Sequence, residues 1–291
     1  MDSVLKMEKV VKSFGRKEVL RELDFDVPQG SVIGLLGKNG AGKTTLMKCA
    51  LGLLKPRAGQ ISVYGEDALD LSGATKARIG YVAQTSSFYY WMRIGDMIDY
   101  TASFYPKWNV KLVDQLVQDW QLNRKDSAVK LSEGQKQRLS IILALGLEPD
   151  FLILDEPAAS LDPIARRQFL KTILDMIADR ECTVLFSSHI TSDIERIADR
   201  VAFLNEGKMI FTGEVDGLKD TVKLLKVIFL GSRPAQIDVP GMLRVKSVGD
   251  QSFIFVKDYN INLKSQLESR WNARIETVDL NLEEIFVEMT K

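Results

Sequence analysis

Gly37-Lys38-Asn39-Gly40-Ala41-Gly42-Lys43-Thr44 is the stretch of this 291-residue sequence that decides its fold. It follows an apolar run over residues 31–36 and opens a segment of helical character over residues 43–54. Glycines let backbone N–H groups turn toward a bound phosphate, and the start of the following helix favours an anion. Lys43 supplies a positive charge near the β- and γ-phosphates, and the Thr44 hydroxyl is placed for Mg²⁺. The stretch therefore predicts the phosphate-binding loop of a nucleotide site.

Two carboxylates further along the chain extend this prediction. Residues 151–154 form an apolar run that predicts a buried strand, and Asp155 and Glu156 follow it directly. Asp155 suits the Mg²⁺-binding role of a strand-end acid, and Glu156 is placed to orient and deprotonate an attacking water. Without the glycine-rich loop, the two would be ordinary strand-end acids. With it they predict a nucleotide-hydrolysing site, a combination that GTPases and small-molecule kinases also use.

The pattern around these motifs indicates an α/β domain over residues 1–219. Runs of consecutive apolar residues indicate strands buried in a parallel sheet, with helices covering it. Strands are expected at 4–14, 19–27, 31–36, 61–64, 79–82, 151–154 and 183–186, and a helix at 163–177. Between about residues 86 and 147 helical patterns replace the strands, which predicts a helical subdomain inserted into the core.

Residues 220–291 are expected to form a small α+β domain. Strand-like runs occur at 224–230, 243–248 and 253–256. The chain ends in an amphipathic helix, and Asn281 and Glu284 have the spacing of a capping box at its start. This appendage could regulate the enzyme, support dimerisation or simply pack; dimer support is the interpretation that we favour.

Composition narrows the functional classes. Basic and acidic residues balance at 39 each, so no generic nucleic-acid binding is expected. Cys49 and Cys182 lie in apolar segments, which predicts buried, reduced thiols. The first residues carry no secretory signal, and the longest apolar runs are shorter than the ~20 residues of a membrane-spanning helix. We therefore expect a chain that does not enter a membrane by itself.

Leu131-Ser132-Glu133-Gly134-Gln135 decides among the nucleotide hydrolases. Here the sequence resembles the ABC (ATP-binding cassette) ATPase family, whose signature reads Leu-Ser-Gly-Gly-Gln. The resemblance covers residues 1 to about 218 in motif order. It includes Gln84 after a strand, Ser160-Leu161-Asp162, and His189, the only histidine in the chain. Phe14 stands where the family stacks an aromatic ring on adenine, although an aromatic residue at a strand end is often part of the core.

The resemblance implies a P-loop ABC ATPase fold with an N-terminal β subdomain, and a dimer that encloses ATP and Mg²⁺ between two copies. Ser132 and Gly134 of one copy would face the phosphate loop of the other, where a helix start favours the γ-phosphate. Glu133 departs from the signature glycine, but an acid in a first helical turn is compatible with the helix dipole. Expected ATP contacts are Phe14, Gly37, Lys38, Asn39, Gly40, Ala41, Gly42, Lys43, Thr44, Thr45, Ser132, Gly134, Gln135 and Asp162; catalytic residues are Glu156, His189 and Gln84; and Mg²⁺ contacts are Thr44, Gln84 and Asp155.

The family resemblance further implies a subunit that powers transport by a separate integral membrane permease. The C-terminal ending Leu282-Glu283-Glu284-Ile285-Phe286 is similar to that of bacterial ABC exporters of the ABC-2 type, and this second resemblance implies export. Such a protein works as a homodimer or with a related ATPase, in the cytoplasm on the inner face of the cell membrane. The aromatic residues Phe88, Tyr89 and Trp91 would either meet that permease or form the core of the helical subdomain. The alternative function is that of a soluble ABC ATPase in a non-transport assembly or repair process.

Overall fold

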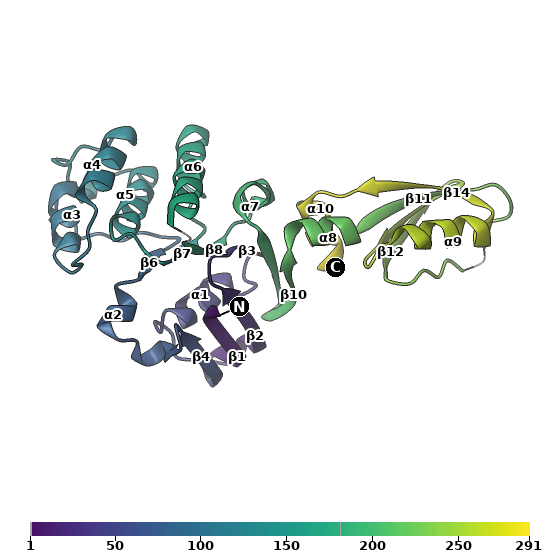
Figure 1. Ribbon diagram of the computed structural model, residues 1–291, viewed down its shortest axis with the longest axis horizontal. Coiled ribbons are helices and arrows are strands. Elements are labelled where there is room, and N and C mark those ends of the chain that lie inside the picture. Colours follow the sequence, from purple (N-terminus) through teal and green to yellow (C-terminus); the bar gives the residue numbers. More distant parts are fainter. Residues whose placement is uncertain (1, 181, 235) are drawn as a thin grey trace. The chain divides into compact units, whose positions relative to one another are not determined.

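The computed structural model describes residues 2–180, 182–234 and 236–291, and it divides the chain into two compact units (Figure 1). The first unit ends at Thr212 and the second begins at Gly213. The boundary predicted after residue 219 would fall within helix α8 (Val215–Thr221). The Tyr259 N–H donates to the Thr221 carbonyl, 2.8 Å away, which ties the end of α8 to the second unit.

A six-stranded sheet forms the centre of the first unit. Its strands are arranged in the order β10 (Lys208–Glu214), β9 (Arg200–Asn205), β3 (Val32–Gly37), β8 (Thr183–Ser187), β7 (Phe151–Asp155) and β6 (Ile79–Val82). The pairs β3–β9, β3–β8, β7–β8 and β6–β7 are parallel. Every residue of β3, β7 and β8 is buried, because both faces of the sheet are covered. The predicted parallel sheet is therefore confirmed.

A second, antiparallel sheet and helix α1 (Lys43–Ala50) share one hydrophobic core with the six-stranded sheet. The second sheet has the order β2 (Lys17–Pro28), β1 (Ser3–Phe14), β4 (Ala58–Val63) and β5 (Glu66–Asp67), and the short helices η1 (Ala68–Asp70) and α2 (Gly73–Lys76) follow it. Helix α1 ends earlier than the predicted residue 54, because Gly52 adopts a φ of 68° that an α-helix does not use. Cys49 and Cys182 are both buried, as predicted.

Helices alone fill the predicted insertion over residues 86–147 (Figure 1). They are α3 (Ile94–Ala102), α4 (Val110–Asp119), η2 (Ala128–Lys130) and α5 (Glu133–Gly146). Two further helices, α6 (Pro163–Arg180) and α7 (Thr191–Ile197), follow β7 and β8. Among the residues described, no helix is both long and apolar enough to span a membrane.

The second unit has its own core and its own four-stranded antiparallel sheet. The strand order is β12 (Met242–Val248), β13 (Gln251–Val256), β11 (Lys223–Phe229) and β14 (Ala273–Asp279). Helix α9 (Ile261–Trp271) buries Leu263, Leu267 and Trp271 in this core, and neither α9 nor β14 was expected from the sequence. The predicted capping box of the last helix, α10 (Leu282–Met289), is confirmed, since Asn281 and Glu284 each accept the other's backbone N–H at 2.9 Å.

Gly34 in β3 has no side chain, and this lets α7 pack closely against the sheet. A Cβ atom at Gly34 would lie 2.3 Å from Cγ2 of the buried Ile194, so Gly34→Ala must displace α7 or the strand. We expect the free energy of unfolding to fall by about 1–3 kcal/mol, measured by urea denaturation.

Gly217→Ala is the matched control for this substitution. Gly217 lies exposed in α8, where an added Cβ meets no atom closer than 4.0 Å. This variant should gain up to about 1 kcal/mol from helix propensity. Equal unfolding free energies for Gly34→Ala and the wild type would contradict the close packing of α7 on β3.

Candidate active site

The glycine-rich loop joins the buried strand β3 to helix α1. Gly42 is the N-cap of α1 with a φ of 113°, a conformation that side chains rarely adopt, so glycine is required there. The loop lies beside a cavity of about 480 Å³. The cavity is lined by Phe14, Lys17, Val19, Asn39, Gly40, Gly42, Lys43, Thr44, Thr45, Gln84 and Glu156. Loop, cavity and helix start together form the concave site that a nucleotide phosphate requires.

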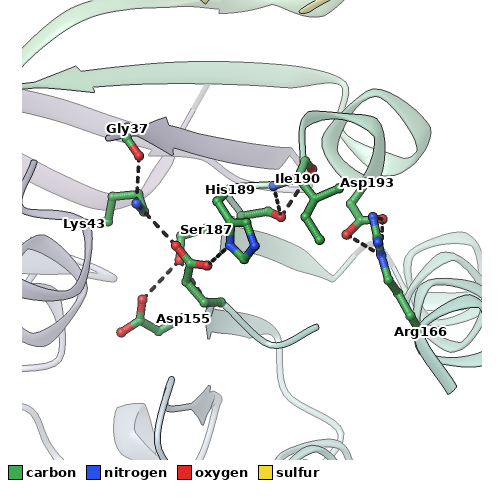
Figure 2. Close-up of polar contacts among 10 residues, drawn as sticks. Gly37, Lys43, Asp155, Arg166, Ser187, His189, Ile190 and Asp193 are labelled. Carbon is green, nitrogen blue, oxygen red and sulfur yellow. Dashed lines mark hydrogen bonds and ion pairs between the residues drawn. The ribbon is translucent and has the colours of Figure 1, made fainter. Parts of the chain in front are cut away.

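Lys43 and Glu156 form an ion pair at the base of this cavity. Lys43 Nζ lies 3.3 Å from Glu156 Oε1, and each side chain is only 7% exposed. The same ammonium donates to the Gly37 carbonyl at 2.8 Å (Figure 2). A buried charge is costly unless it is paired, so the two side chains stabilise one another. The pair brings the cation of the phosphate loop and the acid that follows β7 into contact.

Ser187 connects the two carboxylates that end β7. Its hydroxyl donates to Asp155 Oδ1 at 3.1 Å, and its oxygen accepts from the Glu156 N–H at 2.9 Å (Figure 2). Asp155 and Ser187 are fully buried and face each other across the parallel β7–β8 pair. The serine therefore fixes Asp155 through its side chain and Glu156 through its backbone.

Asp155 has the character of a cation ligand. Burial raises the pKa of its carboxyl group, although hydrogen bonds from the side chains of Thr44 and Ser187 favour the charged form. Its Oδ2 atom is buried and has no hydrogen-bond partner among the described residues. A buried carboxylate oxygen without a donor suits a hard divalent cation, which prefers oxygen ligands. Asp155 and the adjoining Thr44 hydroxyl therefore fit Mg²⁺.

His189 contacts the second oxygen of Glu156. His189 Nδ1 and Glu156 Oε2 lie within hydrogen-bonding distance (Figure 2), and the imidazole is 54% exposed. Glu156 has a φ of 50°, in the left-handed region that non-glycine residues occupy at a cost of about 1–3 kcal/mol. Such strain concentrates at functional sites. This backbone turn presents the carboxylate to Lys43 on one side and to His189 on the other.

Gly37, Lys38 and Ala41 belong to the glycine-rich loop but are not in the cavity lining, and the remaining predicted site residues divide into two groups. Phe14 and Gln84 line the cavity together with the phosphate loop. Phe14 is 50% exposed and is therefore not a core residue, and Lys12 Nζ lies 5.1 Å from the centre of its ring. Ser132, Gly134, Gln135 and Asp162 are not part of the cavity lining. Ser132 and Gln135 cap α5 reciprocally, and Asp162 Oδ1 accepts from the N–H groups of Ile164 and Ala165 at the start of α6.

Three residues of the site were not predicted from the sequence: Ser187, Lys17 and Val19. Ser187 is a polar residue at the end of an apolar strand, and that position is the signal that could have found it. Lys17 and Val19 line the cavity from the first residues of β2. These residues are exposed or half-buried, and the alternation of polar and apolar residues along the strand does not distinguish them from other surface residues.

Comparison with known proteins agrees with this geometry. A family model described as ABC transporter matches residues 20–159. The bacitracin transport ATP-binding protein BcrA of Bacillus licheniformis is 34% identical over 221 residues, which cover 75% of this chain and 72% of that protein. The Nod factor export ATP-binding protein I of Burkholderia lata is 33% identical over 290 residues, covering 97% of this chain and 95% of that protein.

Solved structures share the fold. One described as the ATP-binding subunit of an ABC transporter has a TM-score of 0.68 and 27% identity, covering 75% of this chain and 92% of that chain. A bacterial Atm1-family ABC exporter with ATP bound has a TM-score of 0.63 and 27% identity, covering 72% of this chain and 38% of that chain. The predicted fold class is confirmed, and the non-transport alternative is not favoured. The chain belongs to the family of ABC transporter ATP-binding proteins, which hydrolyse ATP to power transport by membrane-spanning partners.

Proposed function

We propose that this chain powers export through a separate membrane permease, working at the inner face of the membrane as a homodimer or with a related ATPase. A relative named for bacitracin transport supports a transport function, and a relative named for Nod factor export and an Atm1-family exporter structure support its direction. The observation that carries the proposal is the convergence of Lys43, Asp155, Glu156 and His189 around one cavity edge. Lys43 and Asp155 suit ATP binding, and Glu156 with His189 suits ATP hydrolysis.

Each residue of the set then has a role. The phosphate loop binds the phosphates through its N–H groups and Lys43, and the ring of Phe14 at the cavity rim stacks on adenine. Thr44 and Asp155, with Gln84 nearby, would hold Mg²⁺, which neutralises phosphate charge when it is bound. As the phosphates draw Lys43 toward them, the Glu156 carboxylate loses its ion-pair partner and becomes available to take a proton from water. His189 keeps that carboxylate oriented.

Ser132, Gly134, Gln135 and Asp162 serve the site of the second subunit in this proposal. Ser132 and Glu133 are exposed at the start of α5, where free N–H groups favour an anion. Glu133 lies 2.7 Å from Lys136 Nζ, an ion pair that offsets the negative charge at the position where the signature has glycine. This compensation supports retained activity despite the substitution.

An exposed aromatic cluster supports docking on a membrane partner. It comprises Tyr89, Tyr90, Trp91, Tyr100 and Phe104. Neighbouring rings contact one another at centroid distances of 4.8–6.1 Å, and Tyr90 and Trp91 are 68% and 63% exposed. Contiguous exposed aromatics mark interaction sites, whereas core residues would be covered. We therefore favour the permease interpretation for Tyr89 and Trp91, while Phe88 is half-buried.

Glu156→Gln tests the assignment of the general base. Because the amide cannot accept a proton from water, we expect steady-state ATP turnover to fall by about 10²–10⁴-fold, with ATP still bound. Glu148→Gln is the matched control, since Glu148 has a similar φ of 52° but precedes β7 instead of following it. Unchanged phosphate release by Glu156→Gln would refute the assignment.

Ser187→Ala tests the hydroxyl that connects the two carboxylates. The variant loses both hydrogen bonds of the buried serine, which should cost about 1–3 kcal/mol of stability. Turnover should fall by about tenfold or more, because Asp155 and Glu156 lose their common anchor. Ser252→Ala removes another fully buried serine hydroxyl, in the second unit, and should leave turnover unchanged. Full activity of Ser187→Ala would contradict the anchoring role.

Affinity purification from detergent-solubilised membranes tests the transport proposal. We expect a multi-spanning protein to co-purify in near-equal amount, and the double substitution Tyr90→Ala/Trp91→Ala to reduce its recovery by about tenfold or more. Leu53→Ala is the control, because Leu53 is similarly exposed (61%) but lies outside the cluster. Recovery of soluble partners alone would instead support the non-transport alternative.

A further inference from the structure

Two arginine–aspartate ion pairs form a chain of contacts from the signature segment to His189. The first joins α5 to Asp162: Arg138 Nη2 lies 2.5 Å from Asp162 Oδ2. A Cβ atom at Gly134 would lie 3.0 Å from the Ser160 carbonyl, so the first turn of α5 packs directly on residues 160–162. The signature segment and the segment before α6 are therefore in contact within one subunit.

Arg166 continues this chain from the first turn of α6. Its N–H donates to the Asp162 carbonyl at 2.9 Å, and Asp162 Oδ1 caps the same turn. The main chain of Arg166 is therefore held directly to residue 162. The Arg166 guanidinium points toward Asp193 (Figure 2).

The second ion pair joins Arg166 to Asp193 in α7. Arg166 Nε lies 2.8 Å from both carboxylate oxygens of Asp193, and Nη2 lies 2.5 Å from Oδ1 (Figure 2). The Asp193 side chain is only 5% exposed. Charge-assisted bonds from a planar guanidinium fix orientation as well as distance, and a buried carboxylate holds its partner strongly.

Asp193 in turn fixes the far end of the loop that carries His189. The Asp193 N–H donates to the Ile190 carbonyl at 3.1 Å, and Ile194 beside it packs into the space above Gly34. The near end of the loop is held by β8, where Ser187 binds Asp155 and Glu156. His189 lies between these two anchors, so its imidazole position depends on both.

We propose that Arg166 is a positioning residue for ATP hydrolysis, holding the His189 loop against residues 160–162 through Asp193. Arg166 does not line the cavity and forms its ion pair with Asp193, so in this proposal it acts through the loop that carries His189. Displacement of residues 160–162 or of the signature segment is transmitted to the imidazole through this guanidinium. The inference rests on the proposed role of His189 beside Glu156.

Arg166→Lys tests the inference, because lysine keeps the charge but offers no planar fork. In the full-length chain we expect kcat for ATP to fall by about 10- to 100-fold, while KM for ATP changes by less than about threefold. In a His189→Ala background the same substitution should change kcat by less than about twofold, since its effect passes through the imidazole. Losses that simply multiply in the double variant would overturn the inference.

Arg78→Lys is the matched control. Arg78 Nε lies 2.6 Å from Asp150, a comparable Arg–Asp pair that precedes β6 and β7, at the opposite end of these strands from Asp155. This variant should keep the wild-type kcat, and an equal loss in it would overturn the inference by showing a general structural effect. If Arg166→Lys does not fold, the neutral pair Arg166→Gln/Asp193→Asn replaces it, with the same kcat loss and the same non-additivity expected.

The outcome for His189→Ala separates the two hypotheses. If this variant keeps full turnover, the proposed role of His189 fails, and the inference about Arg166 fails with it. If His189→Ala loses turnover but Arg166→Lys does not, the role of His189 stands and the inference alone is overturned.

Discussion

The parallel register of β3, β8 and β7 is the constraint on which the site depends. In this register Ser187 lies opposite Asp155 on one side and Leu35 on the other. Because carboxyl ends of parallel strands share one edge of a sheet, residues far apart in the sequence emerge next to each other. Lys43, Glu156 and His189 all lie within a few residues of these strand ends. A shift of one residue in β7 or β8 would turn Asp155 or Ser187 to the opposite face.

The charges of Lys43, Glu156 and Asp155 at this edge of the sheet determine which ligands the site favours. Lys43 and Glu156 form an ion pair in which each side chain is only 7% exposed, whereas Asp155 is fully buried and receives hydrogen bonds from the Thr44 and Ser187 hydroxyls and a weaker electrostatic attraction from Lys43. Burial outweighs these interactions and raises the pKa of Asp155, so its carboxylate favours either a proton or a cation. A nucleotide that arrived with a divalent cation would supply an anion for Lys43 and a cation for Asp155 together. The charges of the site therefore favour a nucleotide together with a divalent cation over either ligand alone.

The sequence predicted the central sheet and the phosphate loop because both depend on local patterns. Unbroken apolar runs marked β3, β7 and β8, and glycine spacing marked the loop. Helix α9 was missed because its buried residues Leu263, Leu267 and Trp271 form a narrow stripe in a polar segment. Ser187 and the Arg166–Asp193 pair were missed for another reason. Their significance arises from partners 27 to 32 residues away, and no spacing rule identifies such partners.

The solitary histidine has a practical consequence for spectroscopy. His189 is the one imidazole in the sequence, and it lies against Glu156 at the cavity edge. In a preparation without an added polyhistidine tag, every imidazole signal in a nuclear magnetic resonance spectrum therefore originates from the position beside Glu156. No assignment by mutagenesis is needed, and ring carbon or nitrogen shifts report directly on tautomer and protonation. The protein thus contains an intrinsic probe through which each stage of its nucleotide cycle can be observed in solution.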